Sequence, residues 1–332
     1  MGRLAEQLQG ERQARMALSM IAEPNDRLTG GLLRRVGGVE TIRLIEDPDR
    51  VPEMNRADAL AWRQRLAPRI APNVMDQIQA AEDAGLGVVV PGDKHWPAGL
   101  TDLGAGEPYV LWTRGATSLL GQRIGEQITM TGARAASPYG TQIALEFATD
   151  FAADEITVVS GGAYGIDAHA HRGALAAGGH TVAVMAGGLD RLYSAGNREL
   201  LERVGDVGAV VSEMPPGASP TRWRFLARNR VLAAMSGSTV VVEAGYRSGS
   251  LGVAGIAHEL GRHVGAVPGP ITSATSSGSH RLIREGYAEI VTTPEEVREL
   301  GEERQADGIA STAVRSLPGR SPAEHTPPER SL

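Results

Sequence analysis

The sequence predicts an α/β fold in which a doubly wound, mostly parallel sheet follows a helical region. Seven short apolar runs rich in β-branched residues alternate with helical patterns between about residues 127 and 300. Each run is apolar throughout, as a parallel sheet covered on both faces requires. The alternation of strand and helix also implies right-handed crossovers between parallel strands. We therefore expect one sheet with helices on both faces.

The predicted strands also locate the candidate site. In chain order they are expected at residues 127–131, 156–160, 180–186, 208–214, 238–244, 263–269 and 288–293. In an open parallel sheet, ligands bind outside the carboxyl ends of the strands, where loops lead into helix N-termini. The loops that follow these strands are therefore the places to look for chemistry.

The chain divides into three regions by the texture of its sequence. Residues 1–114 are expected to form a helical region, SAM-like or helix-hairpin-like, with a linker; Gly37 and Gly38 divide two apolar helical stretches there. Such a hairpin often contacts nucleic-acid backbones, but a plain packing unit is the favoured interpretation. Residues 115–300 form the α/β domain. Residues 301–332 are polar, rich in Pro and Ser and aperiodic, so we expect a disordered tail.

Composition excludes several classes of protein. The chain has no cysteine, which excludes disulfides, cysteine-based zinc sites and thiol nucleophiles. No apolar run reaches the roughly 20 residues that cross a bilayer, and the first residues are charged. We expect a cytoplasmic protein without a membrane partner. The formal net charge is −6, and Lys94 is the only lysine, so the positive charge is almost entirely arginine.

One predicted helix carries positive charge that nearby acids do not balance. Residues 222–236 contain four arginines, and no carboxylate lies between Glu213 and Glu243. A helical projection places Arg224 and Arg228 in the arc that faces the sheet, and the helix dipole disfavours cations in this N-terminal half. An external polyanion at the carboxyl edge of the sheet would supply the missing charge. The alternative is internal pairing with acids such as Glu213 or Glu243.

Two strand-to-helix loops combine an arginine or hydroxyl groups with a helix start. After the first predicted strand, Arg134 precedes Ser137, a predicted N-cap, and Pro138 at the first helical position. An arginine beside free helix amides is a natural phosphate contact, and a solvated loop arginine is an alternative of equal weight. The loop after the fifth strand places Ser248 and Gly249 at a helix start, a composition that again suits an anion.

Two further loops supply glycines and an aromatic residue. Gly161 and Gly162 let the backbone approach a phosphate closely, and Asp167 is placed to cap the next helix. The loop after the third strand supplies Tyr193 and Asn197. A tyrosine there is able to stack on a base, although packing beneath its own loop is the more common outcome. Several such loops at one edge favour an extended anion over a single nucleotide.

Common enzymatic motifs do not explain the loops. The glycine-rich loop is not a GxGxxG fingerprint and the chain has no GxxxxGK[ST], so neither a dehydrogenase nor a P-loop ATPase is indicated and no cofactor is expected. His169 and His171 point to different faces of their predicted helix, which disfavours a metal site. Ser160 lacks the GxSxG elbow of a hydrolase.

From about Met130 to Val297 the chain contains, in order, the motifs TGARAASPYG, VVSGGAYGIDAHAHRGAL, GLDRLYSAGNREL, SEMPPGASP, FLARNRVLAAMSGSTVVVEAGYRSGSLG and VPGPITSATSSGSHRLIREG. In sequence and order these motifs resemble those of the DprA/Smf DNA-processing proteins. The resemblance implies an extended Rossmann-like domain preceded by a small helical domain. It also implies a non-catalytic homodimer that binds single-stranded DNA. In natural transformation such a protein helps to load the RecA recombinase onto incoming DNA, displacing or accommodating single-strand binding protein.

The resemblance also implies which residues contact DNA. These are Arg134 of the GAR motif, Ser160 and Gly161 of the SGG motif, Asn197, the triplet Arg228, Asn229 and Arg230, and Ser248 with Gly249. The chain departs from the family pattern at Gly162 and Tyr164, where SGLARGID or a similar motif is usual. It also ends in the short tail where many members carry a winged-helix domain. The alternative function is a Rossmann protein that binds or senses a nucleotide in the same glycine-rich crevice.

Overall fold

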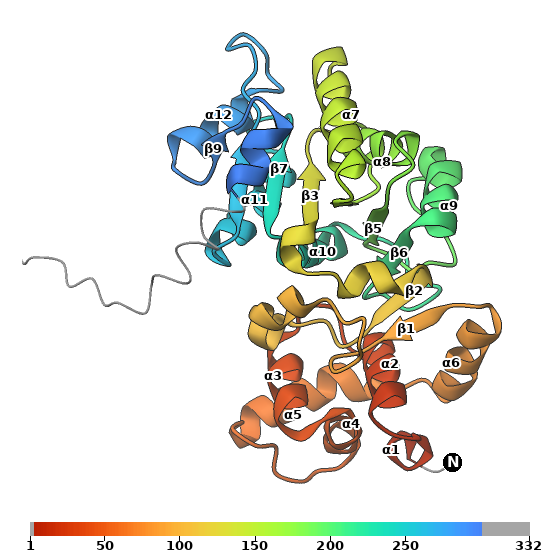
Figure 1. Ribbon diagram of the computed structural model, residues 1–332. Helices are drawn as coiled ribbons and strands as arrows, with labels where there is room; N and C mark the ends of the chain where they lie inside the picture. The colour runs from red at the N-terminus through yellow and green to blue at the C-terminus, as the bar shows by residue number, and fades with distance from the viewer. Residues whose placement is uncertain (1–2, 301–332) are drawn as a thin grey trace, which may run out of the picture.

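The computed structural model describes residues 3–300, which contain one nine-stranded sheet (Figure 1). The strand order is β1-β2-β6-β5-β4-β3-β7-β8-β9. All neighbours from β6 to β9 are parallel, whereas β1 with β2 and β2 with β6 are antiparallel. The order reverses at β3, which pairs with β4 on one side and β7 on the other. The predicted doubly wound, mostly parallel fold is therefore confirmed.

All seven predicted strands are present, and two more were missed. The strands are β1 Gly87–Val89, β2 Leu111–Gly115, β3 Gln127–Thr131, β4 Thr157–Ser160, β5 Thr181–Met185, β6 Ala209–Ser212, β7 Ser238–Val241, β8 His263–Ala266 and β9 Glu289–Ile290. The missed strands β1 and β2 lie at the antiparallel end of the sheet, outside the regular strand–helix alternation that begins at about residue 127. The sheet thus receives strands from both sides of residue 114, and the predicted domain boundary there stays a prediction.

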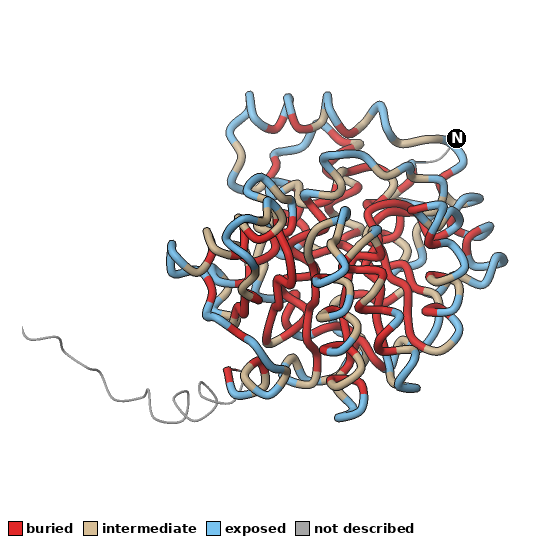
Figure 2. Tube along the Cα trace, turned by 90° about the horizontal axis from the view of Figure 1, so that it is seen from above, coloured by how far each residue is buried: buried red, intermediate tan, exposed pale blue. Residues whose placement is uncertain are grey.

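Helices cover both faces of the parallel strands, as Figure 1 shows. On one face, apolar residues of α7 and α8 pack against Met130 and Val158. On the other, residues of α10 and α11 pack against Val159 and Val184. Figure 2 shows the buried residues concentrated in the middle of the molecule and the exposed ones at its periphery. The helices of this part are α7 Pro138–Ala153, α8 Ile166–Ala176, α9 Arg198–Val207, α10 Arg222–Met235, α11 Ser250–Glu259 and α12 Ser277–Arg284.

Local sequence signals set two of these helix starts, one as expected and one not. The Ser137 side chain accepts from Gly140 N with Pro138 at the first position, so the predicted cap of α7 is confirmed. Asp167 does not cap α8, because the N-cap is Gly165 and no side chain caps that helix. The Asp167 carboxylate instead accepts from Thr131 Oγ1, 3.1 Å away on the neighbouring strand.

The N-terminal region is a helical layer built around a hairpin. Its apolar centre includes Trp62, Met16 and Ile42. Gly37 joins the two hairpin helices at φ 81°, and the Gly38 N–H donates to Glu11 Oε2 at 2.6 Å. The first amide of the second helix is thus satisfied within this region, as a packing unit requires. The helices are α1 Leu4–Gln7, α2 Glu11–Ile21, α3 Arg27–Val36, α4 Gly38–Glu46, α5 Arg56–Leu66 and α6 Val74–Asp83.

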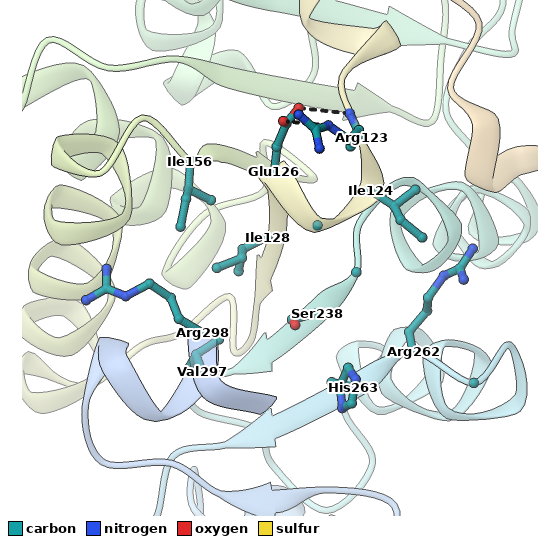
Figure 3. Close-up of a pocket in the computed structure, with 13 residues that line it drawn as sticks. Arg123, Ile124, Glu126, Ile128, Ile156, Ser238, Arg262, His263, Val297 and Arg298 are labelled. Atoms are coloured by element: carbon teal, nitrogen blue, oxygen red, sulfur yellow. Dashed lines mark hydrogen bonds and ion pairs between the residues drawn. The ribbon is translucent and has the colours of Figure 1, made fainter. Parts of the chain in front are cut away.

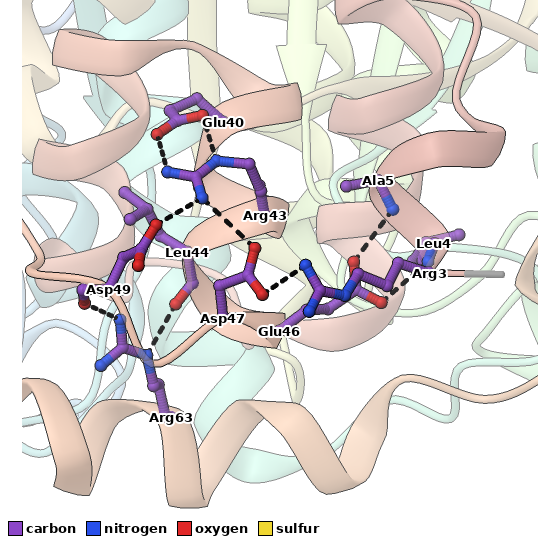
Figure 4. Close-up of polar contacts among 10 residues, drawn as sticks. All are labelled: Arg3, Leu4, Ala5, Glu40, Arg43, Leu44, Glu46, Asp47, Asp49 and Arg63. Atoms are coloured by element: carbon purple, nitrogen blue, oxygen red, sulfur yellow. Dashed lines mark hydrogen bonds and ion pairs between the residues drawn. The ribbon is translucent and has the colours of Figure 1, made fainter.

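A polar network ties the first helices together (Figure 4). Arg43 bonds to the carboxylates of Glu40, Asp47 and Asp49, and Glu46 accepts from the first amides of α1. The remaining short helices are η1 Ala67–Arg69, η2 Ala98–Gly106, η3 Thr117–Gly121, η4 Ile124–Glu126 and η5 Ala195–Asn197. No helix among residues 3–300 is both long enough and apolar enough to span a membrane.

Candidate functional site

An open pocket of about 430 Å³ lies where the strand order reverses. The loops after β3 and β7 form two of its walls, and the N-terminal half of α10 and the start of α11 complete it. This is the position at which doubly wound sheets bind their ligands. Among the residues that line it are Thr131, Arg134, Asp167, Phe225, Leu226, Arg228, Asn229, Ser248, Gly249 and Ser250.

Arg134 and an aromatic pair form one side of this pocket. The Arg134 guanidinium carbon lies 4.9 Å from the centroid of the Phe225 ring. The ring of Tyr193 contacts the same phenyl group edge-on, with centroids 5.7 Å apart at 63°. Tyr193 is 45% exposed, so it does not pack wholly beneath its own loop. A cation and two aromatic rings therefore lie together at the edge of the pocket.

Arg228 is the buried cation of the pocket. Its side chain is 7% exposed, and Nη1 donates to the Val184 carbonyl at 2.7 Å while Nε has no hydrogen-bond partner. No ion pair with a carboxylate forms within the described range 3–300. Burial lowers the pKa of Arg228; the Asp167 carboxylate opposes this effect, and the Arg134 cation adds to it. A positive group is thus held in a poorly solvated position with incomplete compensation.

Gly161 makes room for this arrangement. A Cβ added there would lie 2.1 Å from Arg228 Nη1 and 2.7 Å from Asp167 Oδ2. Only a glycine lets the backbone pass between the guanidinium and the carboxylate. Asp167 is 4% exposed, and burial raises the pKa of its carboxyl group despite the nearby Arg228. The Asp167 carboxyl group and the Arg228 guanidinium are therefore both shielded from water at the floor of the pocket.

The glycine loop after β4 is held by side chains from two other segments. Asn197 donates from Nδ2 to the Gly162 and Ala163 carbonyls at 3.2 and 3.0 Å. The Tyr164 hydroxyl accepts from the Gly196 N–H at 3.0 Å, so the loops after β4 and β5 are bonded to each other in both directions. Asn197 is 3% exposed and supports the loop from beneath it.

Two of the sequence-predicted residues bond to carbonyl groups of neighbouring elements of the fold. Ser160 is fully buried, and its hydroxyl donates to the Met130 carbonyl at 2.7 Å. Asn229 donates from Nδ2 to the Gly249 carbonyl at 3.1 Å and so joins α10 to the start of α11. The Ser248 hydroxyl lies 2.7 Å from that of Ser250. Of these side chains, only Ser248 and Ser250 present hydroxyl groups to the pocket.

Two arginines of α10 pair with carboxylates inside the protein, and a third lines the pocket. Arg230 forms a bidentate pair with Glu213, both distances being 2.6 Å, and Nε donates to the Gly106 carbonyl. Arg224 forms a bidentate pair with Glu23 of the N-terminal region at 3.0 Å. Internal pairing therefore accounts for these two arginines, whereas Arg228 alone of the three lines the pocket.

The structure separates the two histidines and also brings Phe225 to the pocket. His171 is fully buried and its Nδ1 lies 2.7 Å from Thr181 Oγ1, whereas His169 Nδ1 lies 2.8 Å from the Gly165 carbonyl. No cluster of metal-ligating residues forms in the described part of the chain. Sequence reasoning did not name Phe225 as a site residue, although its position three residues before Arg228 on a helix was a usable signal.

A second pocket of about 420 Å³ lies at the opposite, amino edge of the sheet (Figure 3). Ile124, Ile128 and Ile156 contribute its apolar lining. Its arginines are paired: Arg123 with Glu126, Arg262 with Asp102, and Arg298 with Glu295. Each of these three guanidinium groups thus has a carboxylate partner, whereas Arg228 forms no ion pair within residues 3–300.

The comparison with protein families decides the identity of the chain. A family model described as DNA recombination-mediator protein A matches residues 87–301. The chain belongs to this family. The match includes all nine strands and every loop that forms the pocket at the carboxyl edge. The predicted DprA/Smf membership is confirmed.

Relatives and solved structures of this family agree with the assignment. A DprA-type DNA processing protein of Mycobacterium tuberculosis is 41% identical over 293 residues, which are 85% of this chain and 73% of that protein. The structure of Streptococcus pneumoniae DNA processing protein A matches with a TM-score of 0.68 and 30% identity, over 85% of this chain and 94% of that one. The structure of Helicobacter pylori DNA processing protein A, which concerns that protein's single-stranded DNA binding mode, matches with a TM-score of 0.58 and 25% identity. It covers 67% of this chain and 96% of that one.

Proposed function

We propose that this chain binds single-stranded DNA in the pocket between β3, β7 and α10. The observation that carries the proposal is Arg228, a buried guanidinium without an ion-pair partner among residues 3–300. A DNA phosphate would supply the opposite charge that the protein leaves out. Arg134 and the N-terminus of α11 supply further donors for the backbone, and the exposed part of Tyr193 offers a ring for a base.

The proposed contacts keep the residues identified from the sequence, with two different tasks. Arg134, Arg228, Ser248, Gly249 and Tyr193 are proposed to contact the DNA directly. We propose that a second group shapes the backbone around the DNA, because its contacts are within the protein: Ser160, Gly161, Gly162, Asn197, Asn229 and Arg230. Phosphate contacts by arginine and amide groups carry no base code, so binding is expected to be salt-dependent and to have little sequence preference.

Family membership supports a wider role than binding alone. We propose that the protein is a cytoplasmic, non-catalytic recombination mediator that acts as a homodimer, protects incoming DNA and promotes its loading with RecA. On single-stranded DNA coated with single-strand binding protein, it would displace or accommodate that protein. RecA filament formation on such DNA, measured with and without this chain, tests the role; no gain in rate or extent would contradict it.

The binding proposal is tested by fluorescence anisotropy with labelled oligo-dT across a salt series. Arg134→Ala and Arg228→Ala are each expected to weaken binding and to reduce the salt slope by about 1. Arg123→Ala is the matched control, since it removes one positive charge from a side chain that is 90% exposed at the opposite edge of the sheet. Equal affinities for all four proteins would remove the proposal.

The nucleotide-sensing alternative predicts a different outcome in the same pocket. Calorimetry with mononucleotides is compared with oligo-dT under one salt condition. An extended anion is expected to bind much more tightly than a single nucleotide, because it releases more counterions. Tight binding of a mononucleotide with no affinity for the oligomer would favour the alternative.

A further inference from the structure

Helix α10 contributes residues to the pocket and is also bound by carboxylates outside it. Phe225 and Arg228 line the pocket. Arg230 is bound to Glu213 and Arg224 is bound to Glu23, and neither of these two arginines lines the pocket. Glu23 belongs to the turn between α2 and α3. The N-terminal helical region is therefore bonded to the first turn of α10, which contributes residues to the pocket.

The turn that carries Glu23 is itself fixed in place. Asn25 adopts φ 61°, a conformation that asparagine tolerates better than most residues. The buried Tyr109 hydroxyl donates to the Glu23 and Asp26 carbonyls at 3.3 and 3.4 Å. A second cation, Arg69, donates to Glu23 Oε1 at 2.8 Å. Hydrogen bonds from two other segments, through Tyr109 and Arg69, therefore hold the turn that carries the carboxylate.

The Arg224 side chain donates hydrogen bonds both to this turn and to the residues just before its own helix. Nε and Nη2 donate to the two Glu23 oxygens at 3.0 Å each, and Nη1 donates to the Ser219 carbonyl at 2.7 Å. Arg224 is 15% exposed, so losing its partner would leave a largely buried cation in the first turn of a helix, where the dipole also opposes it. Such a turn would be expected to loosen, and Phe225 is its next residue.

We propose that Glu23 is a positioning residue for DNA binding, by which the helical region holds the N-terminal turn of α10 and with it Phe225 and Arg228 in the pocket. This inference rests on the proposed binding of single-stranded DNA. It predicts the opposite change in DNA affinity from the one that charge alone predicts. Removing an acid near a site for a polyanion should strengthen binding, whereas removing the support of α10 should weaken it.

The test measures oligo-dT affinity and the exposure of Trp223 together. Trp223 is 56% exposed on the first turn of α10, whereas the other three tryptophans are at most 8% exposed, so acrylamide quenching of intrinsic fluorescence reports this turn. Glu23→Gln is expected to raise the dissociation constant about 3- to 10-fold and to increase quenching. The control, Glu53→Gln, removes an acid that is 72% exposed and paired with Arg35 inside the helical region. It should change neither reading.

A double-mutant cycle separates this contact from a general loss of stability. Arg224→Gln and the double variant E23Q/R224Q break the same contact, so the double variant should bind no more weakly than the weaker single variant. Losses that add, or E23Q binding as tightly as the wild type or more tightly, would overturn the inference. Weaker binding without a change in quenching would also overturn it, since α10 would not have moved. Wild-type protein that does not bind oligo-dT would instead refute the proposed function, and this inference with it.

Discussion

The Arg134 guanidinium lies over the Phe225 ring, 4.9 Å from its centroid, although Arg134 comes from the loop after β3 and Phe225 from α10. The Arg228 guanidinium lies 5.9 Å from the same centroid. Both cations thus lie close to one phenyl ring, and they repel each other, as the effect of Arg134 on the pKa of Arg228 indicates. The negative face of the ring partly offsets that repulsion and keeps both cations at the pocket.

Phe225→Ala should therefore weaken DNA binding without removing any charge. The expected loss is about 1–3 kcal/mol, the range for an aromatic side chain that supports a base or a neighbouring cation. The salt slope should stay near the wild-type value, because the number of arginines is unchanged. Anisotropy with oligo-dT across a salt series measures both quantities. Phe225→Tyr, which keeps a ring, is the control and should bind like the wild type.

Gly161→Ala should weaken DNA binding while leaving most of the fold intact. The added Cβ would meet Arg228 Nη1 at 2.1 Å and Asp167 Oδ2 at 2.7 Å, so the guanidinium must leave its position. The loss is expected to equal that of Arg228→Ala, and the two changes together should cost little more than one. Gly255→Ala is the control, since its Cβ would meet nothing within 4 Å. If Gly161→Ala binds like the wild type, Arg228 is not the cation that DNA contacts.

The sequence predicted the strands and most of the pocket loops because their signals are local. A buried parallel strand needs a continuous apolar run, and Ser137 followed by Pro138 is a local helix start, confirmed by the structure. Strands β1 and β2 were missed although residues 86–90 and 109–112 are apolar, because they lie outside the regular strand–helix alternation and pair antiparallel. Periodicity therefore located the carboxyl edge, while the antiparallel extension depended on pairing between distant segments.

The partners of the α10 arginines could not be read from the sequence. Arg224 pairs with Glu23, which lies about two hundred positions earlier in the chain, and no local sequence pattern predicts that contact. Glu213, which the sequence offered as an internal partner of Arg224 or Arg228, pairs with Arg230 instead. Glu243, the other, accepts from Ser137 and Thr275 instead. Helical periodicity gives the face on which a residue lies, but the packing of whole segments decides which charge it meets.

Asp167→Asn should strengthen DNA binding. The carboxylate is buried beside Arg228, and burial raises its pKa, so its charge is poorly solvated and would repel an incoming phosphate. Asparagine keeps an oxygen that accepts from Thr131 and removes the charge. We expect about a 3- to 10-fold lower dissociation constant at neutral pH. Asp190→Asn, at an acid in the loop after β5, is the control measured in the same anisotropy assay. Weaker binding by the Asp167 variant would show that the carboxylate holds Arg228 in place.

His171 should make the folded state sensitive to acid. Its ring is fully buried, Nε2 has no hydrogen-bond partner, and burial lowers the pKa to about 3 from the ordinary 6.5. Thr181 Oγ1 gives its hydrogen to the Val158 carbonyl, so it accepts from His171 Nδ1–H, and the bare Nε2 is the atom that a proton would reach. The stability supplied by the neutral ring is complete above about pH 6.5. It is lost as the pH falls toward 3, because the unfolded chain takes up the proton first.

The measurement is the free energy of unfolding in urea at a series of pH values for the wild type and His171→Asn. Asparagine donates to Thr181 as Nδ1 does but does not titrate, so the variant should lack the part of the acid sensitivity that His171 causes. The difference between the two proteins should change by up to about 1.4 kcal/mol per pH unit below pH 6.5 and stay constant above it. His169→Asn, on the same helix but with a partly exposed side chain, is the control for replacing a histidine of α8 by asparagine. Parallel curves for the wild type and His171→Asn would show that His171 takes up its proton in the folded protein as readily as in the unfolded chain.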